Sequence, residues 1–129
     1  MYSEKFYESI GHAFYAVAHA NQKVDKKEID TLIKIVRNEW APLEDETDEF
    51  GEDAAFHIIS VFDWLTDNDV KEKEAIQHFK EYVSNHQKLF TTDIKNIILK
   101  TCEKIAASSH KTSKNENKVI QEIKQILNL

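Results

Sequence analysis

The sequence of 129 residues contains two glycines, one proline and one cysteine. Phosphate-cradling loops, dinucleotide-binding turns and tight β-hairpins all use glycine, because it adopts left-handed backbone conformations without strain. The low glycine count therefore argues against nucleotide-binding folds and hairpin-rich β-proteins. The single cysteine, Cys102, excludes an internal disulfide and fits a reducing compartment. It lies on the apolar stripe of an expected helix, where we expect a buried thiol.

Cationic side chains are also few, since 17 Lys and Arg stand against 23 Asp and Glu for a net charge of −6. Binding to a nucleic-acid backbone needs a concentrated positive face, so we expect no nucleic-acid partner. No apolar run is long enough to cross a bilayer, and the first residues contain no apolar signal core. We therefore expect no direct membrane insertion and a cytoplasmic location.

What is abundant is helical periodicity. Apolar residues recur at spacings of three and four along most of the chain, and no segment alternates with a period of two. The pattern predicts an all-α bundle of six or seven helices in a single domain, residues 1–129. We expect helices at about 4–19, 26–40, 53–66, 69–87, 93–108 and from about 114 onwards.

Side chains at the helix starts indicate where each helix begins. Polar residues that can accept a hydrogen bond from the first turn precede five of the expected helices, and the expected N-caps are Ser3, Asp25, Asp69, Thr92 and Ser113. Pro42 disfavours helical geometry at the residue before it, so the second helix should stop near Trp40. The helix at 53–66 is apolar around nearly its whole circumference, so we expect it at the centre of the fold. We also expect Trp40 and Trp64 in the core or at its boundary.

One pattern occurs twice. Residues 18–28 read AHANQKVDKKE and residues 106–116, 88 positions later, read AASSHKTSKNE. In both segments an amphipathic helix ends in small residues, a polar turn follows and a capped helix begins. The repeat predicts two pseudo-symmetric helix–turn–helix halves around a central buried helix.

The repeated segment resembles the duplicated loop–helix motif of the TerB-like family, which is named for a tellurite-resistance protein. The family motif reads roughly small-Asp-Gly-x-hydrophobic-x-x-x-Glu, and its two copies here are residues 20–28 and 108–116. The resemblance implies one TerB-like helical domain with an acidic linker at about 43–53. It further implies a non-enzymatic module in bacterial stress or tellurite resistance that binds a divalent cation or docks a protein partner.

In that family the acidic motif positions are associated with divalent cations. The carry-over retains both motif glutamates, whereas neutral side chains replace both aspartates of the Asp-Gly pairs. The candidate ligands for a divalent cation are Glu28, Glu116, Asn21 and Asp25. Ser109 holds the second aspartate position, and Gln22 and His110 hold the glycine positions. Each lost carboxylate weakens a site for a hard cation, so the inherited site is degenerate in this chain.

An alternative needs no metal. Glu28 and Glu116 each stand three residues after an expected N-cap, where a carboxylate bonds back to the cap amide and favours the positive helix end. Capping alone then explains both residues. The alternative function is a structural or adaptor protein whose metal site has decayed and which has no ligand.

The histidines offer a weaker hypothesis. Glu8, His12, Tyr15 and His19 share one face of the first expected helix, opposite its apolar stripe. They form either a surface metal site or a solvated face, and the second is favoured because His12 and His19 lie about 10.5 Å apart along the axis. An enzyme would need several distant histidines to converge in one pocket, namely His12, His19, His57, His78 and His86. We expect no enzymatic activity.

Residues 44–53 contain seven carboxylates. The segment lacks the alternating ligands and central glycine of an EF-hand. Three interpretations remain, which are a solvated linker, a surface that docks a basic protein partner, and a specific ion site.

Overall fold

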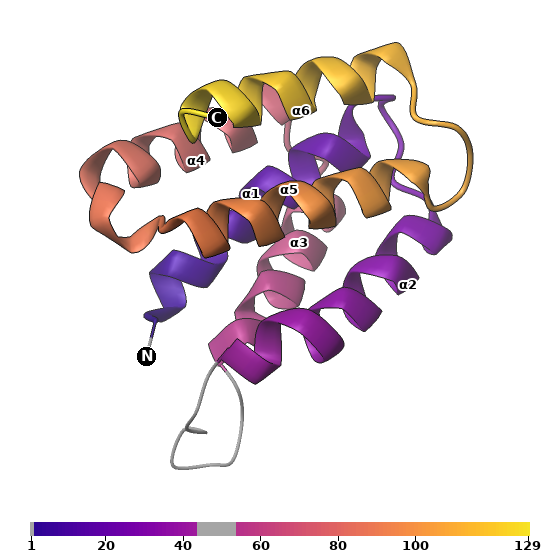
Figure 1. The fold of residues 1–129 in the computed structure, drawn as a ribbon. Coiled ribbons are helices and arrows are strands. Elements are labelled where there is room, and N and C mark those ends of the chain that lie inside the picture. The colour runs from indigo at the N-terminus through magenta and orange to yellow at the C-terminus, as the bar shows by residue number, and fades with distance from the viewer. Residues whose placement is uncertain (1, 44–53) are drawn as a thin grey trace.

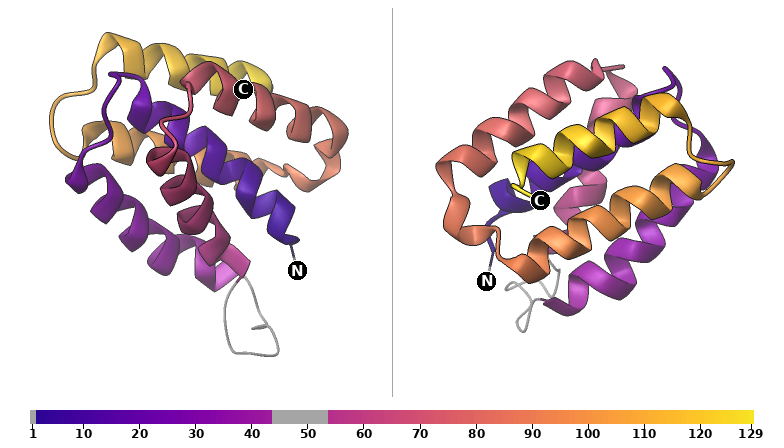
Figure 2. Two further views of the ribbon diagram at one scale, coloured as in Figure 1. Left: turned by 180° about the vertical axis from the view of Figure 1, so that it is seen from behind. Right: turned by 45° about the horizontal axis from the view of Figure 1, so that its top comes forward.

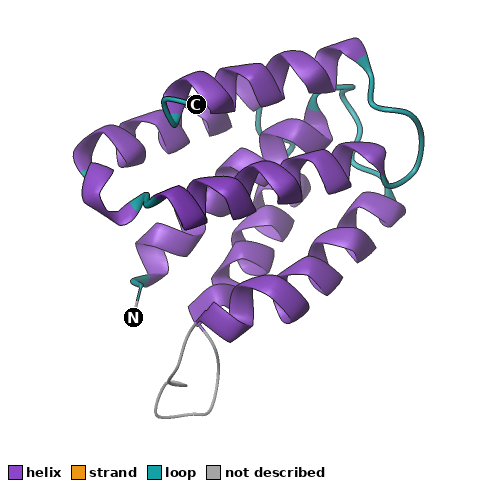
Figure 3. Ribbon diagram, viewed as in Figure 1, coloured by secondary structure: helices purple, strands orange, loops and turns teal. Residues whose placement is uncertain are grey.

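The structure, a computed structural model, describes residues 2–43 and 54–129. Within these ranges the chain is all-α and contains no strand (Figures 1 and 3). Six α-helices are present in the described residues: α1 Glu4–His19, α2 Lys26–Ile35, α3 His57–Asp67, α4 Glu72–Asn85, α5 Thr92–Ala107 and α6 Lys114–Ile126. The all-α prediction is confirmed. No described helix has both the length and the apolar character that a membrane span requires.

The central helix is α1, so the expectation that the 53–66 helix would occupy the centre is wrong. α1 packs against α3, α4, α5 and α6, and Figure 2 shows it passing between them. Its predicted apolar stripe is buried, and so are Tyr15 and Ala16 on other faces. The sequence does not reveal how completely α1 is buried, because some of its buried side chains are polar. These side chains make hydrogen bonds inside the fold. Ser9, for example, donates to the carbonyl of Phe6 at 2.7 Å.

α3 covers the core with one face only. Ile58, Phe62 and Leu65 are buried, whereas Trp64 is 59% exposed, which contradicts its expected place in the core or at its boundary. Trp40 does lie in the core, and its indole N–H donates to the hydroxyl of Thr101 at 3.2 Å. Ile59 and Val61 pack against the core from partly buried positions, so neighbours surround α3 less completely than its apolar circumference predicts.

α1 and α3 approach each other closely at Gly11. A Cβ at this position would clash with the side chain of Val61 and lie 3.0 Å from the carbonyl oxygen of Ile58. The glycine costs helix propensity of about 1 kcal/mol relative to alanine, but it permits this contact between the two backbones.

Most helix starts and stops follow local rules. Ser3, Asp25 and Ser113 cap their helices as predicted, and α2 continues through a π-helical turn, Val36–Trp40, to end just before the Ala41–Leu43 turn that contains Pro42. Two caps differ from the expectation. Thr91 caps α5 in place of Thr92, and α4 begins after Lys71 in place of Asp69.

The internal repeat is a property of the fold. α1 and α5 each contain 16 residues, and all their ends are offset by 88 positions, as are the starts of α2 and α6. α6 packs against α1, and α2 packs against α5. Each half therefore places its second helix on the first helix of the other half. This exchange brings the two repeated loops to the same end of the bundle (Figure 1).

Candidate metal centre

The two loop–helix junctions, residues 19–28 and 107–116, are hydrogen-bonded to each other. The hydroxyl of Ser109 donates to Asp25 Oδ2 at 2.6 Å, and the hydroxyl of Ser113 donates to Asn21 Oδ1 at 3.1 Å. The candidate ligands from the two ends of the sequence therefore meet in one place.

Each junction contains a complete capping box. The amide of Glu28 donates to Asp25 Oδ1 at 2.9 Å, and the amide of Asp25 donates to Glu28 Oε1 at 3.0 Å. Ser113 and Glu116 make the same reciprocal pair at 3.1 and 2.9 Å. The capping role predicted for both glutamates is confirmed, and it occupies one oxygen of each carboxylate.

The second oxygen of each carboxylate is the unusual feature. Glu28 is 2% exposed and Glu116 is fully buried. Among the described residues neither Glu28 Oε2 nor Glu116 Oε2 has a hydrogen-bond partner. A buried carboxylate oxygen without a partner is costly, because it has lost its water and gained nothing in exchange. A proton or a cation between the two glutamates would remove that cost.

The local electrostatics support uptake of positive charge here. Burial raises the pKa of Glu28 to about 7; the hydrogen bond from the Asp25 amide opposes this rise, and the negative charges of Asp25 and Glu116 add to it. For Asp25, burial also acts to raise the pKa. The hydrogen bonds from the Ser109 hydroxyl and the Glu28 amide outweigh that effect, and the pKa of Asp25 is lowered.

His110 stands at the open side of this cluster. Its ring Nδ1–H donates to the carbonyl of Lys111 at 2.7 Å, and the same nitrogen lies 3.8 Å from Glu116 Oε1. The bond to Lys111, followed by the charge of Glu116, raises the pKa of His110. From the sequence, His110 was noted only because it stands where the family motif has glycine. Its contact with Glu116 could not be predicted, because that contact depends on the loop conformation.

A second polar cluster joins the end of α1 to the start of α4. His19, expected on a solvated face, is 3% exposed and donates to Glu72 Oε2 and Asp69 Oδ1, both at 2.8 Å. Burial acts to raise the pKa of Glu72, but the hydrogen bonds, first that from His19, lower it. No local sequence pattern predicts this cluster, because the two carboxylates that His19 contacts lie about fifty residues away along the chain.

Tyr15 completes the same corner of the fold. Its ring stacks on His19, and its hydroxyl donates to the carbonyl of Val70 at 2.6 Å. Burial, followed by the charges of Asp69 and Glu72, raises the pKa of Tyr15 to about 12. The face of α1 predicted to be solvated is therefore an interface with the start of α4.

The remaining histidines lie in separate places. His12 stacks on His78 with ring centroids 3.7 Å apart, and its Nδ1 donates to the carbonyl of Glu8. Burial lowers the pKa of His12. His86 stacks on Tyr82, on the far part of α4. Of four pockets in the described residues, three are lined by no histidine and the fourth by His86 alone among the histidines.

Glu4, Glu8 and His57 make up a third cluster, where α1 meets the start of α3. In the described ranges this is the one group of three acidic, histidine or cysteine side chains whose ligand atoms lie within 4.8 Å of one another. His57 Nε2 lies 3.4 Å from Glu4 Oε1, and the side chain of Glu4 is largely exposed. The paired junctions hold three carboxylates, those of Asp25, Glu28 and Glu116, together with neutral oxygens, and among these described residues no three ligand atoms lie within that distance of one another.

Comparison with known proteins adds no assignment. No family model, no curated protein and no solved structure matches the chain. The acidic segment predicted to be a linker or docking surface falls at residues 44–53, outside the described residues.

Proposed function

We propose that this chain is a non-enzymatic helical module that binds a hard divalent cation between the two loop–helix junctions. The observation that carries the proposal is the pair of buried carboxylate oxygens, Glu28 Oε2 and Glu116 Oε2, that lack partners in the described structure. Carboxylate and amide oxygens are the ligands that Ca²⁺, Mg²⁺ and Mn²⁺ prefer. The resemblance to the TerB-like family suggests the setting, bacterial stress or tellurite resistance.

The ligands would come from both halves of the fold. Glu28 and Glu116 would each supply Oε2 and keep Oε1 in the capping box, so binding needs no loss of the helix starts. Asn21 and Asp25 stand beside them and are already held in place by the serine hydroxyls. Because the pKa of Glu28 is about 7, a cation that binds near neutral pH displaces a proton from this pair.

The test is calorimetric titration of the metal-free protein with Ca²⁺, Mg²⁺, Mn²⁺ and Zn²⁺. We expect one of the first three to bind with release of a proton, which is measured as an enthalpy that depends on the ionisation heat of the buffer. In the Glu28→Gln/Glu116→Gln variant this binding should be lost. Glutamine can still form a capping box, so the variant should fold.

The matched control is Glu4→Gln/Glu8→Gln, which removes the same number of carboxylates from the exposed cluster with His57. It should retain the binding seen in the unmodified chain. Loss of binding in the control alone would move the cation to that cluster, and absence of any binding heat would end the proposal.

A second candidate is the structural or adaptor protein with a decayed site. The observation in its favour is that Asn21 Oδ1 and Asp25 Oδ2 accept hydrogen bonds from serine hydroxyls of the other half. The junctions then serve to hold the two halves together, and a proton on Glu28 leaves the pair with one negative charge in place of two. Thermal unfolding that is the same with chelator as with each cation would favour this candidate.

Docking of a basic partner on residues 44–53 is a separate proposal from the sequence. Affinity capture with the unmodified chain and with a chain whose seven carboxylates in this segment are changed to amides tests it. A partner recovered equally by both chains, or no reproducible partner, would contradict docking at this segment.

A further inference from the structure

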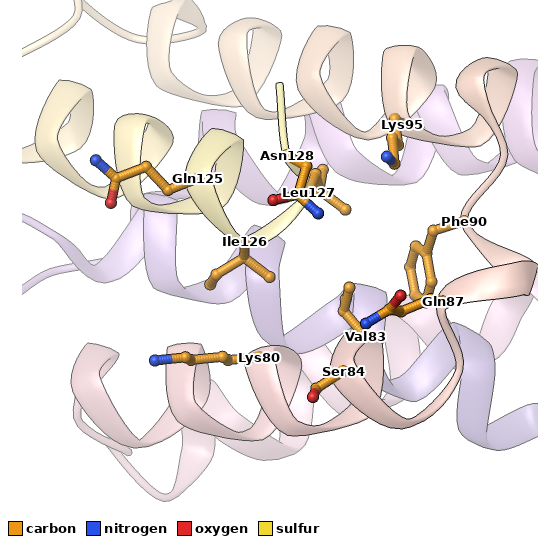
Figure 4. Close-up of a pocket in the computed structure, with 10 residues that line it drawn as sticks. All are labelled: Lys80, Val83, Ser84, Gln87, Phe90, Lys95, Gln125, Ile126, Leu127 and Asn128. Carbon is orange, nitrogen blue, oxygen red and sulfur yellow. The ribbon is translucent and has the colours of Figure 1, made fainter.

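A pocket of about 390 Å³ lies between α4, α6 and the start of α5 (Figure 4). The short turn Gln87–Leu89 that connects α4 to α5 closes one end of it. Pockets that bind small molecules span about 300–1,000 Å³, so this volume is sufficient for a ligand. None of the residues of the two loop–helix junctions lines it.

The pocket has an apolar floor. Val83, Phe90 and Leu127 line it and are otherwise buried in the core, and Ile126 lines it from a partly buried position. In Figure 4 Ile126 and Leu127 lie between α4 and α5 and face the space beside Val83. An alkyl chain placed there would contact these side chains and remove from water the small apolar surface that they still expose, which is favourable.

The rim of the pocket has one sign of charge. Lys80 of α4 and Lys95 of α5 line it from opposite sides (Figure 4), and no carboxylate side chain lines it. Gln87 and Asn128 add uncharged amide donors. In a chain with a net charge of −6, a pocket edged only by lysine and neutral donors selects for an anion.

The hollow continues along the bundle. A second depression of about 530 Å³ lies between α4 and α6 and shares Lys80, Gln125 and Ile126 with the first. Ile76 lines it on the α4 side, so the apolar floor extends beyond the first pocket. Its charged lining is mixed, with Lys73 and Lys80 against Glu122, so the positive end of the groove is the first pocket. The two hollows together form an elongated groove, which suits a linear ligand better than a compact one.

We propose that this groove binds an amphipathic carboxylate, such as a medium-chain fatty acid, with its alkyl chain on Val83, Phe90 and Leu127 and its carboxylate at the rim of the first pocket, attracted by the positive charges of Lys80 and Lys95 on its two sides. The proposal is independent of the cation site. It combines the two properties of the groove, since an alkyl chain alone does not use the lysines and a small anion alone does not use the floor.

The test is titration of the ¹⁵N-labelled protein with decanoate below its micelle concentration, followed by amide chemical shifts. We expect saturable shifts at the lining residues of α4 and α6. Decanol should bind at least tenfold more weakly and decyltrimethylammonium more weakly still. Equal affinity for decanol or the cation, or no shifts with decanoate, would overturn the proposal.

Two sets of variants test the parts of the groove. Lys80→Gln/Lys95→Gln should lower the affinity for decanoate at least tenfold, whereas Lys88→Gln/Lys100→Gln, which makes the same charge change outside this pocket, should leave it unchanged. Ile126→Asn should also weaken binding without loss of helical circular dichroism. Unaltered affinity in the Lys80/Lys95 variant would overturn the assignment of the carboxylate to the lysines, and with it the proposal.

Discussion

The two loop–helix junctions make the same backbone hydrogen bonds at the start of the second helix, but they differ in the charged side chains that surround those bonds. Both have a capping box whose glutamate is buried. The first junction follows a helix fastened through His19 to two carboxylates, and its cap is the charged Asp25. The second follows Ala107, which is exposed, and its cap is the neutral Ser113. The repeat therefore retains the bonds that start a helix, while its charges have diverged.

The largest effect that should separate the halves is the pH dependence due to Glu28. Its folded pKa of about 7 lies above the ordinary 4.5, so the folded state binds the proton more tightly. The stability from this group is fully present below about pH 4.5 and is lost as the pH rises through 7, a change of about 3 kcal/mol in the metal-free protein. Glu28→Gln should remove this decline, whereas Glu116→Gln should retain most of it.

Urea denaturation of the three chains between pH 5 and 8 measures the effect, since subtraction of the Glu28→Gln profile isolates this one group. Parallel profiles for the unmodified chain and Glu28→Gln would show that the buried glutamate does not titrate in this range.

The next effect concerns the bonds that connect α1, through His19, to Asp69 and Glu72. His19→Ala should lower the free energy of unfolding by about 2 kcal/mol, because the ring, its stacking on Tyr15 and two charge-assisted bonds are lost. The figure is kept low because Asp69 is 77% exposed and its share is screened by solvent.

The equivalent position in the second half supplies the control. Ala107→Ser, at the matching helix end, should change the stability by less than about 0.5 kcal/mol. Both variants are compared by urea denaturation at pH 6. If His19→Ala lowers the free energy of unfolding no more than Ala107→Ser does, the contacts of His19 do not contribute to stability.

The caps should differ by less. Asp25→Ala is expected to cost about 1.5 kcal/mol and Ser113→Ala about 1 kcal/mol. Each removes a cap and a bond to the other half, but the bond between Asp25 and Ser109 is shorter and less exposed than that between Ser113 and Asn21. Thermal unfolding of both variants in the Ser109→Ala background sharpens the comparison. In that background the two losses should become equal, and a persistent gap would show that the Ser109 bond is not its source.

The smallest effect lies in the loop backbones. Gln22 adopts a left-handed backbone with φ of 70°, whereas His110 at the equivalent position has no positive φ. Gln22→Gly should relieve strain of about 1 kcal/mol and lose the side-chain bond to Glu72, for little net change. His110→Gly should only destabilise. Thermal melts of both variants give the comparison, and a greater loss at Gln22 would show that its bond to Glu72 outweighs the strain.

Features that depend on a few neighbouring residues could be predicted from the sequence. The capping boxes at Asp25 and Ser113, the extent of α1 and the end of the second helix near Trp40 all follow from spacings of one to four residues. The burial of Cys102 also follows from its stripe. The 88-residue repeat predicted two related halves, and the structure shows that their loops are bonded to each other.

What could not be predicted depends on contacts between distant segments. His19 lies among polar residues on α1, and only the approach of α4 turns that face into an interface. The prediction for Trp64 was wrong in the opposite sense, since burial was expected and the side chain is exposed. Apolar periodicity does not say which side of a helix lacks a neighbour. The lack of hydrogen-bond partners at Oε2 of Glu28 and Glu116 could not be predicted either, since these oxygens become buried only when both halves have folded.

The crossed placement of α2 on α5 and of α6 on α1 has a consequence for synthesis on the ribosome. α1 is synthesised before α6, yet part of its surface is covered by α6. The surface of α1 that packs against α6 stays exposed until α6 has left the exit tunnel. The geometry that unites the two junctions thereby delays the completion of the core until both halves have been synthesised.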